Sequence, residues 1–461
     1  MNYLGINVPL KHVPALDPEF IPLVQFNRAF LKDAKKPVGV AVERSNGQIA
    51  VFPTFIHGTP DMAQADSYYI RRCVKVLLWM KGGWRIYISG DKAIYEDVKK
   101  AYSADGSRWF DKDFMETVYE RPFEVVWCDE LPEEKGASES VGRHLEGCRI
   151  GFDAGGSDRK VSAVIDGETV FSDETVWLPK VNDDLDYHYA GIVDSFKKAA
   201  AHMPRVDGIG ISAAGVIVDN KPMVSSLFNY AKECHPDQFE TRIKPMYIRA
   251  VEDTFGKIPF QVANDGDVTA LAGAMSLNVN NILGIAMGTS EAVGYVDEHG
   301  NITGWLNELA FMPVDANPDA MADEWSGDIG CGVKYLSQDG VIKLAPRAGI
   351  ELNKGATPAE KLNAVQSLME QGDERAAKVY ESIGVYLGHI LAFYCELYGA
   401  EHVLLLGRVM SGKGGEIIVD TSKAVLSDEY PEYASLAIHL PDEKFRRVGQ
   451  SMAAASLPAT K

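Results

Sequence analysis

The sequence predicts a two-lobed α/β protein preceded by a smaller α+β domain. Two strand–turn–strand segments, each turning on glycine and hydroxyl residues, lie around positions 151–165 and 282–297. Helical segments separate these two hairpins, which is typical of two α/β lobes that bind a ligand in the cleft between them. Ahead of them, Leu131–Glu146 is polar, rich in Glu, Ser and Gly, and has no hydrophobic period, so we interpret it as a linker.

Length and charge restrict the classes of protein to consider. A chain of 461 residues favours two or three domains. We expect an accessory α+β domain at 1–130, the linker at 131–146 and the two-lobed domain at 147–461. A net charge of -19 argues against non-specific nucleic-acid binding, which requires a basic surface. The same charge favours a polyphosphate held by backbone N–H groups and a metal rather than by cations, although it is also explained by solubility alone.

The sequence also predicts a cytoplasmic location. The first residues lack the charged and apolar regions of a signal peptide. The most apolar stretch, Ile383–Leu397, is interrupted by His389, Cys395 and Glu396, so we expect no membrane span. The six cysteines are scattered without a CxxC pair, which favours reduced thiols over disulfides or a zinc site.

The N-terminal domain is expected to contain four strands and two helices. Val38–Glu43 and Ile49–Ile56 alternate as strands around Asn46-Gly47, a strong hairpin turn. The elements expected next are a helix at Ala63–Met80, a strand at Trp84–Ser89, a helix at Lys92–Tyr102 and a strand at Phe123–Cys128. This order resembles half of an actin-like lobe but contains no glycine-rich phosphate loop. A degenerate duplicate of the second part and an unrelated accessory domain are both open.

Strands and helices alternate in the second part of the chain. The expected strands are Arg149–Asp153, Val161–Ile165, Glu168–Phe171, Gly208–Ser212, Phe260–Ala263, Asn281–Met287, Ala292–Asp297 and His402–Leu406. The expected helices are Tyr189–Met203, Val268–Ser276, Pro358–Gln371, Glu374–Tyr398 and Gly415–Leu426.

Both hairpins have the residues of a phosphate-binding turn. Gly155, Gly156 and Ser157 follow the first strand, and glycines there allow a phosphate to approach the backbone N–H groups. Asp153, at the end of that strand, is a candidate magnesium ligand. Gly288-Thr289-Ser290 repeats the pattern after an apolar strand, so the pair could hold a polyphosphate from two sides. Plain glycine-rich hairpins are the alternative.

Two further turns lie at strand ends. Asn264-Asp265 leads from a short strand into a helix, so Asp265 could take the proton of a substrate hydroxyl while Asn264 binds neighbouring hydroxyls. Helix capping explains the same two residues equally well in isolation. Gly407–Gly415 is a glycine-rich entry to a helix, suited to the adenosine or phosphate end of a nucleotide, although it matches neither a P-loop nor GxGxxG.

In this order, the motifs resemble those of the ROK family (repressor, open reading frame, kinase) of the actin/hexokinase superfamily, whose fold is ribonuclease-H-like. The resemblance runs from about Gly151 to Leu457. It implies a carbohydrate kinase that uses ATP and Mg²⁺, with Asp265 as general base, Asn264 and Ser212 on the sugar side, and Gly407-Arg408 beside the adenosine. Val448–Ala455 resembles the closing helix of the family, and family habit favours a homodimer.

The sugar-binding segment departs from the family pattern. Family kinases carry Glu-x-x-His here, whereas Asn307-Glu308 is followed by Phe311 at the histidine position. Losing this polar partner changes the preferred substrate, and Phe311 could contact a C–H face, an acetamido methyl or a deoxy position. Only Cys331 remains of the cysteine-rich zinc motif, so no structural zinc is expected. Ser157-Asp158 replaces the usual Thr-Lys, and Arg408 replaces a glycine.

These observations favour an ATP-dependent sugar kinase. A non-catalytic sugar sensor that signals through the N-terminal domain is the alternative, and a kinase with one catalytic and one degenerate tandem unit is a third interpretation. The N-terminal domain has no evident helix-turn-helix and its charges are roughly balanced, which disfavours repression through DNA binding.

Overall fold

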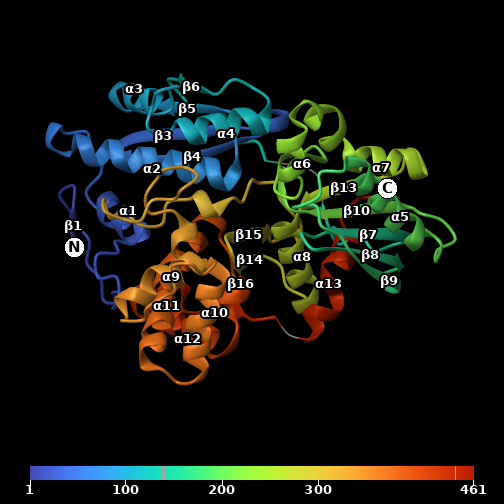
Figure 1. Cartoon of the computed structure of the whole chain (residues 1–461). Coiled ribbons are helices and arrows are strands. Elements are labelled where there is room, and N and C mark those ends of the chain that lie inside the picture. The colour runs from blue at the N-terminus through green and yellow to red at the C-terminus, as the bar shows by residue number, and fades with distance from the viewer. Residues whose placement is uncertain (137–140, 442, 461) are drawn as a thin grey trace. The chain divides into compact units, whose positions relative to one another are not determined.

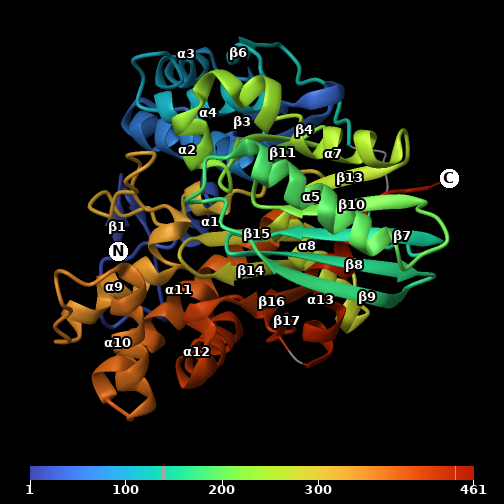
Figure 2. The ribbon, with the colours of Figure 1, turned by 45° about the vertical axis from the view of Figure 1, so that its right-hand side comes forward.

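The computed structural model describes residues 1–136, 141–441 and 443–460, and these form two compact units (Figures 1 and 2). The first unit comprises Met1–Gly136, Ile285–Val293 and Trp305–Leu440, and the second comprises Ala137–Gly284, Gly294–Gly304 and Pro441–Lys461. The N-terminal region therefore shares one compact unit with the chain from 305 to 440. The boundaries expected at 130 and 147 remain sequence-based predictions, and positions 137–140 of the expected linker lie outside the described residues.

The N-terminal region contains a four-stranded sheet in the order β4-β3-β5-β6. Strands β3 (Lys36–Glu43) and β4 (Ile49–Ile56) form the expected antiparallel hairpin, in which Asn46 and Gly47 have φ angles of 58° and 66°. The other elements are α2 (Ala63–Lys81), β5 (Arg85–Ser89), α3 (Lys92–Ala101) and β6 (Glu124–Trp127), all close to their expected bounds. The sequence analysis missed β1 (Asn2–Tyr3), β2 (Ile6–Asn7), α1 (Leu23–Leu31) and α4 (Trp109–Tyr119).

The rest of the first unit contains long helices and most of a second sheet, of which residues 282–284 and 294–296 belong to the second unit. The strands β14 (Ile282–Met287), β15 (Glu291–Val296), β16 (His402–Leu406) and β17 (Ala437–His439) lie in the order β15-β14-β16-β17. The helices are α9 (Gln338–Arg347), α10 (Pro358–Glu370), α11 (Glu374–Tyr398) and α12 (Gly412–Glu429). Gly388 allows α11 and α12 to approach closely, because a Cβ there would lie 2.5 Å from Cβ of Val425.

The second unit contains a five-stranded sheet in the order β13-β10-β7-β8-β9 (Figure 2). Its strands are β7 (Cys148–Ala154), β8 (Asp158–Ile165), β9 (Glu168–Val176), β10 (Gly208–Ala213) and β13 (Phe260–Asn264). Strands β7 and β13 both run parallel to β10, so these three strands end at the same edge. The remaining elements are α5 (Leu185–Ala200), β11 (Gly215–Val218), β12 (Lys221–Ser225), α6 (Asn229–Cys234), α7 (Met246–Phe255), α8 (Asp265–Leu277) and α13 (Glu443–Ala455).

Helices cover both faces of this sheet, for different reasons. Ile150 and Phe152 of β7 point into an apolar core that includes Phe196 of α5. The alternate position, Gly151, faces α13, and a Cβ there would lie 1.7 Å from the backbone oxygen of Ser451. Gly210 of β10 has the same relation to Ala454 at 1.6 Å. Helix α13 can therefore pack on the sheet only because these positions are glycines.

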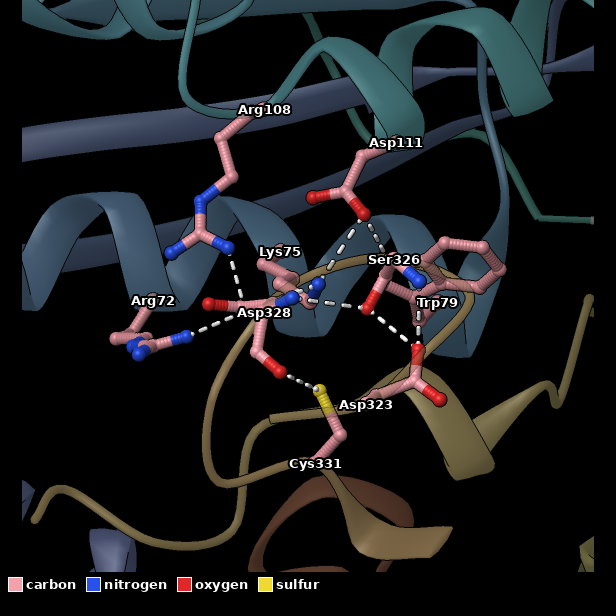
Figure 3. A network of polar contacts seen from close by, with 9 residues as sticks. All are labelled: Arg72, Lys75, Trp79, Arg108, Asp111, Asp323, Ser326, Asp328 and Cys331. Carbon is pink, nitrogen blue, oxygen red and sulfur yellow. Dashed lines mark hydrogen bonds and ion pairs between the residues drawn. The ribbon is translucent and has the colours of Figure 1, made fainter. Parts of the chain in front are cut away.

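A largely buried ion-pair network lies within the first unit (Figure 3). Asp328 accepts from Arg72 Nη1 at 2.7 Å and pairs with Lys75 Nζ at 3.0 Å and with Arg108. Lys75 also pairs with Asp111 at 3.1 Å, and Asp111 accepts from Trp79 Nε1 at 3.0 Å. Burial alone would raise the pKa of Asp328, but the three cations outweigh it and hold that pKa well below its ordinary value.

Replacing Asp328 with Asn should destabilise the protein by about 3 kcal/mol, because it leaves three largely buried cations without their shared carboxylate. Urea unfolding followed by circular dichroism measures the loss. Asp113→Asn, an exposed change on α4, is the matched control and should alter stability by less than about 0.5 kcal/mol. Equal stabilities for the two variants would contradict this account.

Candidate active site

Acidic and polar side chains gather where three parallel strands of the second unit end. In register, Asp153 of β7 lies opposite Ser212 of β10, and Ala213 lies opposite Asn264 of β13. Asp265 follows directly as the first residue of α8. Residues predicted from separate motifs therefore lie at one edge of the sheet, with the two carboxyl groups at the ends of the strands on either side of β10.

The two carboxyl groups have perturbed acidities. Burial, together with the charge of Asp265, raises the pKa of Asp153 to about 6, while a hydrogen bond from the Ser212 hydroxyl opposes the shift. Burial also raises the pKa of Asp265, while the backbone N–H of Gly266 and the charge of Lys180 oppose that shift. Paired carboxyls with raised pKa values are characteristic of sites that handle protons.

Asn264 caps α8, as the capping interpretation of its sequence position proposed. Its side-chain oxygen accepts from the N–H of Gly266 at 2.7 Å, and its amide nitrogen donates to the backbone oxygen of Gly215 at 2.8 Å. One N–H of the amide remains for another acceptor, because the group carries two. The cap orients both Asn264 and the start of α8, where Asp265 stands.

The hydroxyl of Ser212 forms a hydrogen bond with Asp153. Ser212 is fully buried. Its oxygen accepts from Gln450 Nε2 at 3.0 Å, and its hydroxyl donates to Asp153. The same Gln450 nitrogen donates to the backbone oxygen of Asp265 at 2.9 Å. These hydrogen bonds connect Ser212 to both carboxyl-bearing residues, while the expected sugar contact at Ser212 stays a prediction.

Tyr247 and Gln450 are the polar residues of this site that the sequence analysis missed. Tyr247, on α7, is buried in the apolar core, and its hydroxyl has no hydrogen-bond partner among the described residues. Burial, followed by the charges of Asp153 and Asp265, raises its pKa. Nothing in the helical periodicity around Tyr247 distinguishes it from a core aromatic. Gln450 lies in the segment that resembles the closing helix, which was the only available signal.

The first glycine turn joins β7 to β8. A Cβ on Gly155 would lie 2.6 Å from the backbone oxygen of Asp158, so the tightness of the turn depends on that glycine. Ser157 donates from its hydroxyl to Asp158 at 3.1 Å. The backbone oxygen of Ser157 accepts from the N–H of Trp177 at 3.0 Å, which ties the turn to the chain that follows β9.

The second glycine turn lies beside the Gly407 turn within the first unit. The N–H of Gly288 donates to the oxygen of Ser290 at 3.0 Å, which closes the turn around Thr289. Gly407 has a φ of 99°, and a Cβ there would lie 2.5 Å from the oxygen of Met287. The oxygen of Arg408 accepts from Gln366 Nε2 at 2.6 Å. Two motifs that are more than a hundred residues apart thus meet because β14 and β16 are neighbouring strands.

Residues Asn307, Glu308 and Phe311 are packed against α2 in the first unit. The N–H groups of Asn307 and Glu308 donate to the last turn of α2, and the buried Asn307 side chain accepts from Tyr398 at 2.8 Å. The ring of Phe311 lies 4.4 Å from that of Trp79, measured between centroids, and also contacts Phe110 and Phe114. Asn307 and Phe311 are thus held by contacts within the first unit. The sugar contacts expected at Asn307, Glu308 and Phe311 stay predictions.

Metal and membrane features were also sought in the described part of the chain. No group of three or more His, Cys, Asp or Glu side chains is placed to hold a metal ion among residues 1–136, 141–441 and 443–460. All six cysteines are free thiols. No described helix combines the length and apolar character that crossing a membrane requires.

Comparison with known proteins shows the family. The family model described as "ROK family" matches residues 149–437. This chain therefore belongs to the ROK family, with an additional α+β region at its N-terminus. No curated protein sequence matches the chain.

Solved structures show the same mixed α/β fold. The ROK hexokinase of Thermus thermophilus is similar at 15% identity with a TM-score of 0.52, covering 67% of this chain and 96% of that one. A ROK family glucokinase of Streptomyces griseus, in complex with glucose and AMPPNP, is similar at 19% identity with a TM-score of 0.44, covering 67% and 98%. A ROK family transcriptional regulator, a homologue of the E. coli MLC protein, is similar at 17% identity with a TM-score of 0.48, covering 68% and 79%.

Asp153→Asn should raise stability at pH 7 by about 1–2 kcal/mol and flatten its pH dependence. Because the pKa of Asp153 is about 6 when folded, against 3.8 as the ordinary value, the folded state holds the proton more tightly. Its contribution therefore falls as pH rises through that interval. Urea unfolding at several values of pH measures the slope. The exposed change Asp237→Asn is the control, and a slope unaltered by Asp153→Asn would refute the assignment.

Proposed function

We propose that this protein catalyses the ATP-dependent phosphorylation of a sugar hydroxyl, with Asp265 as general base. The observation that carries this proposal is the arrangement of Asp265 and Asp153 at the shared edge of β7, β10 and β13. A carboxyl with a raised pKa is a better proton acceptor than an ordinary one. Membership in the ROK family, whose structural neighbours include sugar kinases, supports the proposal.

In the proposed reaction, a sugar hydroxyl oxygen attacks the terminal phosphorus of ATP. The new O–P bond forms as the bond from that phosphorus to the bridging oxygen of ADP breaks, and its electron pair leaves with ADP. The hydroxyl proton passes to the Asp265 carboxylate. Asp265 must be ionised to accept it, so the rate should fall as pH drops through its raised pKa.

The residues fit a magnesium–polyphosphate ligand. Asp153 supplies a carboxylate oxygen, the ligand type that Mg²⁺ prefers, and the Ser212 hydrogen bond orients it. When bound, magnesium neutralises phosphate charge. The backbone N–H groups of the first turn (Gly155, Gly156 and Ser157) and of the second turn (Gly288, Thr289 and Ser290) would bind the phosphates. Those of Gly407 and Arg408 would lie at the adenosine end.

We propose Asn264 and Glu308 as the leading candidates for sugar contacts. Asn264 retains an amide N–H beyond its capping bonds. Glu308 is held by α2 through its own N–H, which donates to the backbone oxygen of Trp79. Phe311 packs against Trp79, and a contact of this ring with an acetamido methyl or a deoxy position stays a prediction.

A panel of hexoses, amino sugars and N-acetyl sugars tests this function through ADP release. Asp265→Asn should lower the sugar-dependent rate by about 10²–10⁴-fold, because it removes the base. The exposed change Asp237→Asn serves as control and should leave the rate unchanged. An unchanged rate of sugar-dependent ADP release in Asp265→Asn would contradict the mechanism. Sugar binding without ADP release across the panel would instead indicate a sensor.

A further inference from the structure

A turn that follows β9 presents Lys180 to the first glycine turn of the second unit. Strand β9 ends at Val176, and the next residue, Trp177, donates its backbone N–H to Ser157. The chain then folds back, because the N–H of Asn182 donates to the oxygen of Leu178 at 3.1 Å. Lys180 occupies the middle of this turn and is solvent-exposed.

The side chain of Lys180 lies over Gly156. A Cβ placed on Gly156 would lie 3.2 Å from the Lys180 ammonium nitrogen and 2.9 Å from its Cε. The ammonium group can occupy this position because Gly156 has no side chain. No carboxylate lies within 4.0 Å of Lys180 Nζ among the described residues. Its charge does reach Asp265, where it acts to lower the carboxyl pKa.

A buried histidine holds both ends of this turn. Trp177 donates from its indole nitrogen to Nδ1 of His188 at 2.8 Å. The opposite ring nitrogen of His188 lies 2.8 Å from the backbone oxygen of Asn182 and donates to it. Trp177 and His188 are fully buried, and burial lowers the pKa of His188, so the ring stays neutral in this arrangement. The turn around Lys180 is therefore ordered in advance of any ligand.

We propose that Lys180 is a catalytic residue that binds the transferring phosphoryl group at the first glycine turn, an inference that rests on the proposed function. The phosphate must approach the carboxylates of Asp153, Asp158 and Asp265, and a side-chain cation at the turn would add to the charge neutralisation that magnesium supplies when bound. Lys160, the nearby lysine on β8, pairs with Asp158 at 3.7 Å and with Glu174 at 3.9 Å. Lys180 has no such partner within the described part of the chain, and it lies beside Gly156, whose N–H group is proposed to bind phosphate.

With Lys180 at the first glycine turn, a side-chain cation joins the groups that would hold the polyphosphate. An acidic chain favoured a polyphosphate held by backbone groups and a metal alone. Lys180 adds a point charge where negative charge develops as the new O–P bond forms and the bond to ADP breaks. An ammonium group on a flexible stem suits this role, because it can follow the phosphoryl group during transfer.

Lys180→Met, Lys180→Arg and the exposed control Lys197→Met test the inference in the full chain. Lys180→Met should lower kcat/KM for ATP about 10²-fold, with Lys180→Arg recovering part of the loss. Titration calorimetry with MgATP, without sugar, should show about tenfold weaker binding for Lys180→Met. The acid limb of the pH–rate profile should move to higher pH in that variant, because the pKa of Asp265 loses a neighbouring positive charge.

The outcomes separate this inference from the proposed function. Normal turnover and MgATP affinity in Lys180→Met would overturn the inference and leave the kinase function standing. An equal loss in Lys197→Met would also overturn it, because the effect would then not depend on position. MgATP binding that requires Lys180, in a wild-type protein that phosphorylates no sugar of the panel, would support phosphate binding by Lys180 but overturn its catalytic role together with the proposed function.

Discussion

The site depends on one constraint, the close covering of both faces of the β13-β10-β7 part of the sheet. Parallel strands bring their carboxyl ends to one edge, and polar residues placed there become partly buried when helices cover the faces. Core packing covers one face through α5, whereas Gly151 and Gly210 let α13 cover the other in direct backbone contact. Because α13 lies so close, Gln450 reaches both Ser212 and the backbone of Asp265.

Desolvation is the main electrostatic consequence of this arrangement. Asp153 and Asp265 lie close enough for the charge of one to affect the other, and burial raises the pKa of both. A group with these properties is costly to ionise, which opposes folding stability but favours proton acceptance. The net charge of the chain says little about this balance, because the local charges come from individual side chains, such as the Lys180 ammonium group that acts to lower the pKa of Asp265.

The N-terminal region packs together with residues 285–293 and 305–440 in one compact unit. Helix α2 contributes cations to Asp328, carbonyl groups to the Asn307 segment and the indole ring that contacts Phe311. These contacts hold the chain between 305 and 331 by ion pairs, hydrogen bonds and aromatic packing together. These contacts join residues more than two hundred positions apart, and such contacts cannot be inferred from local sequence patterns. The sequence therefore suggested an accessory domain.

Local patterns in the sequence determined most of the elements and the motifs. Turn dipeptides such as Asn46-Gly47 and strand alternation act within a few residues, so hairpins, strand ends and the family were predictable. The role of Asp265 as base stays a prediction. Elements without a strong period, such as α4 and β17, were missed. Contacts between distant segments were decided only by the tertiary structure. Lys180 lies over Gly156, and Tyr247 lies near enough to Asp153 and Asp265 for their charges to raise its pKa. Strand order and helix packing create both arrangements, and the sequence around these residues does not indicate them.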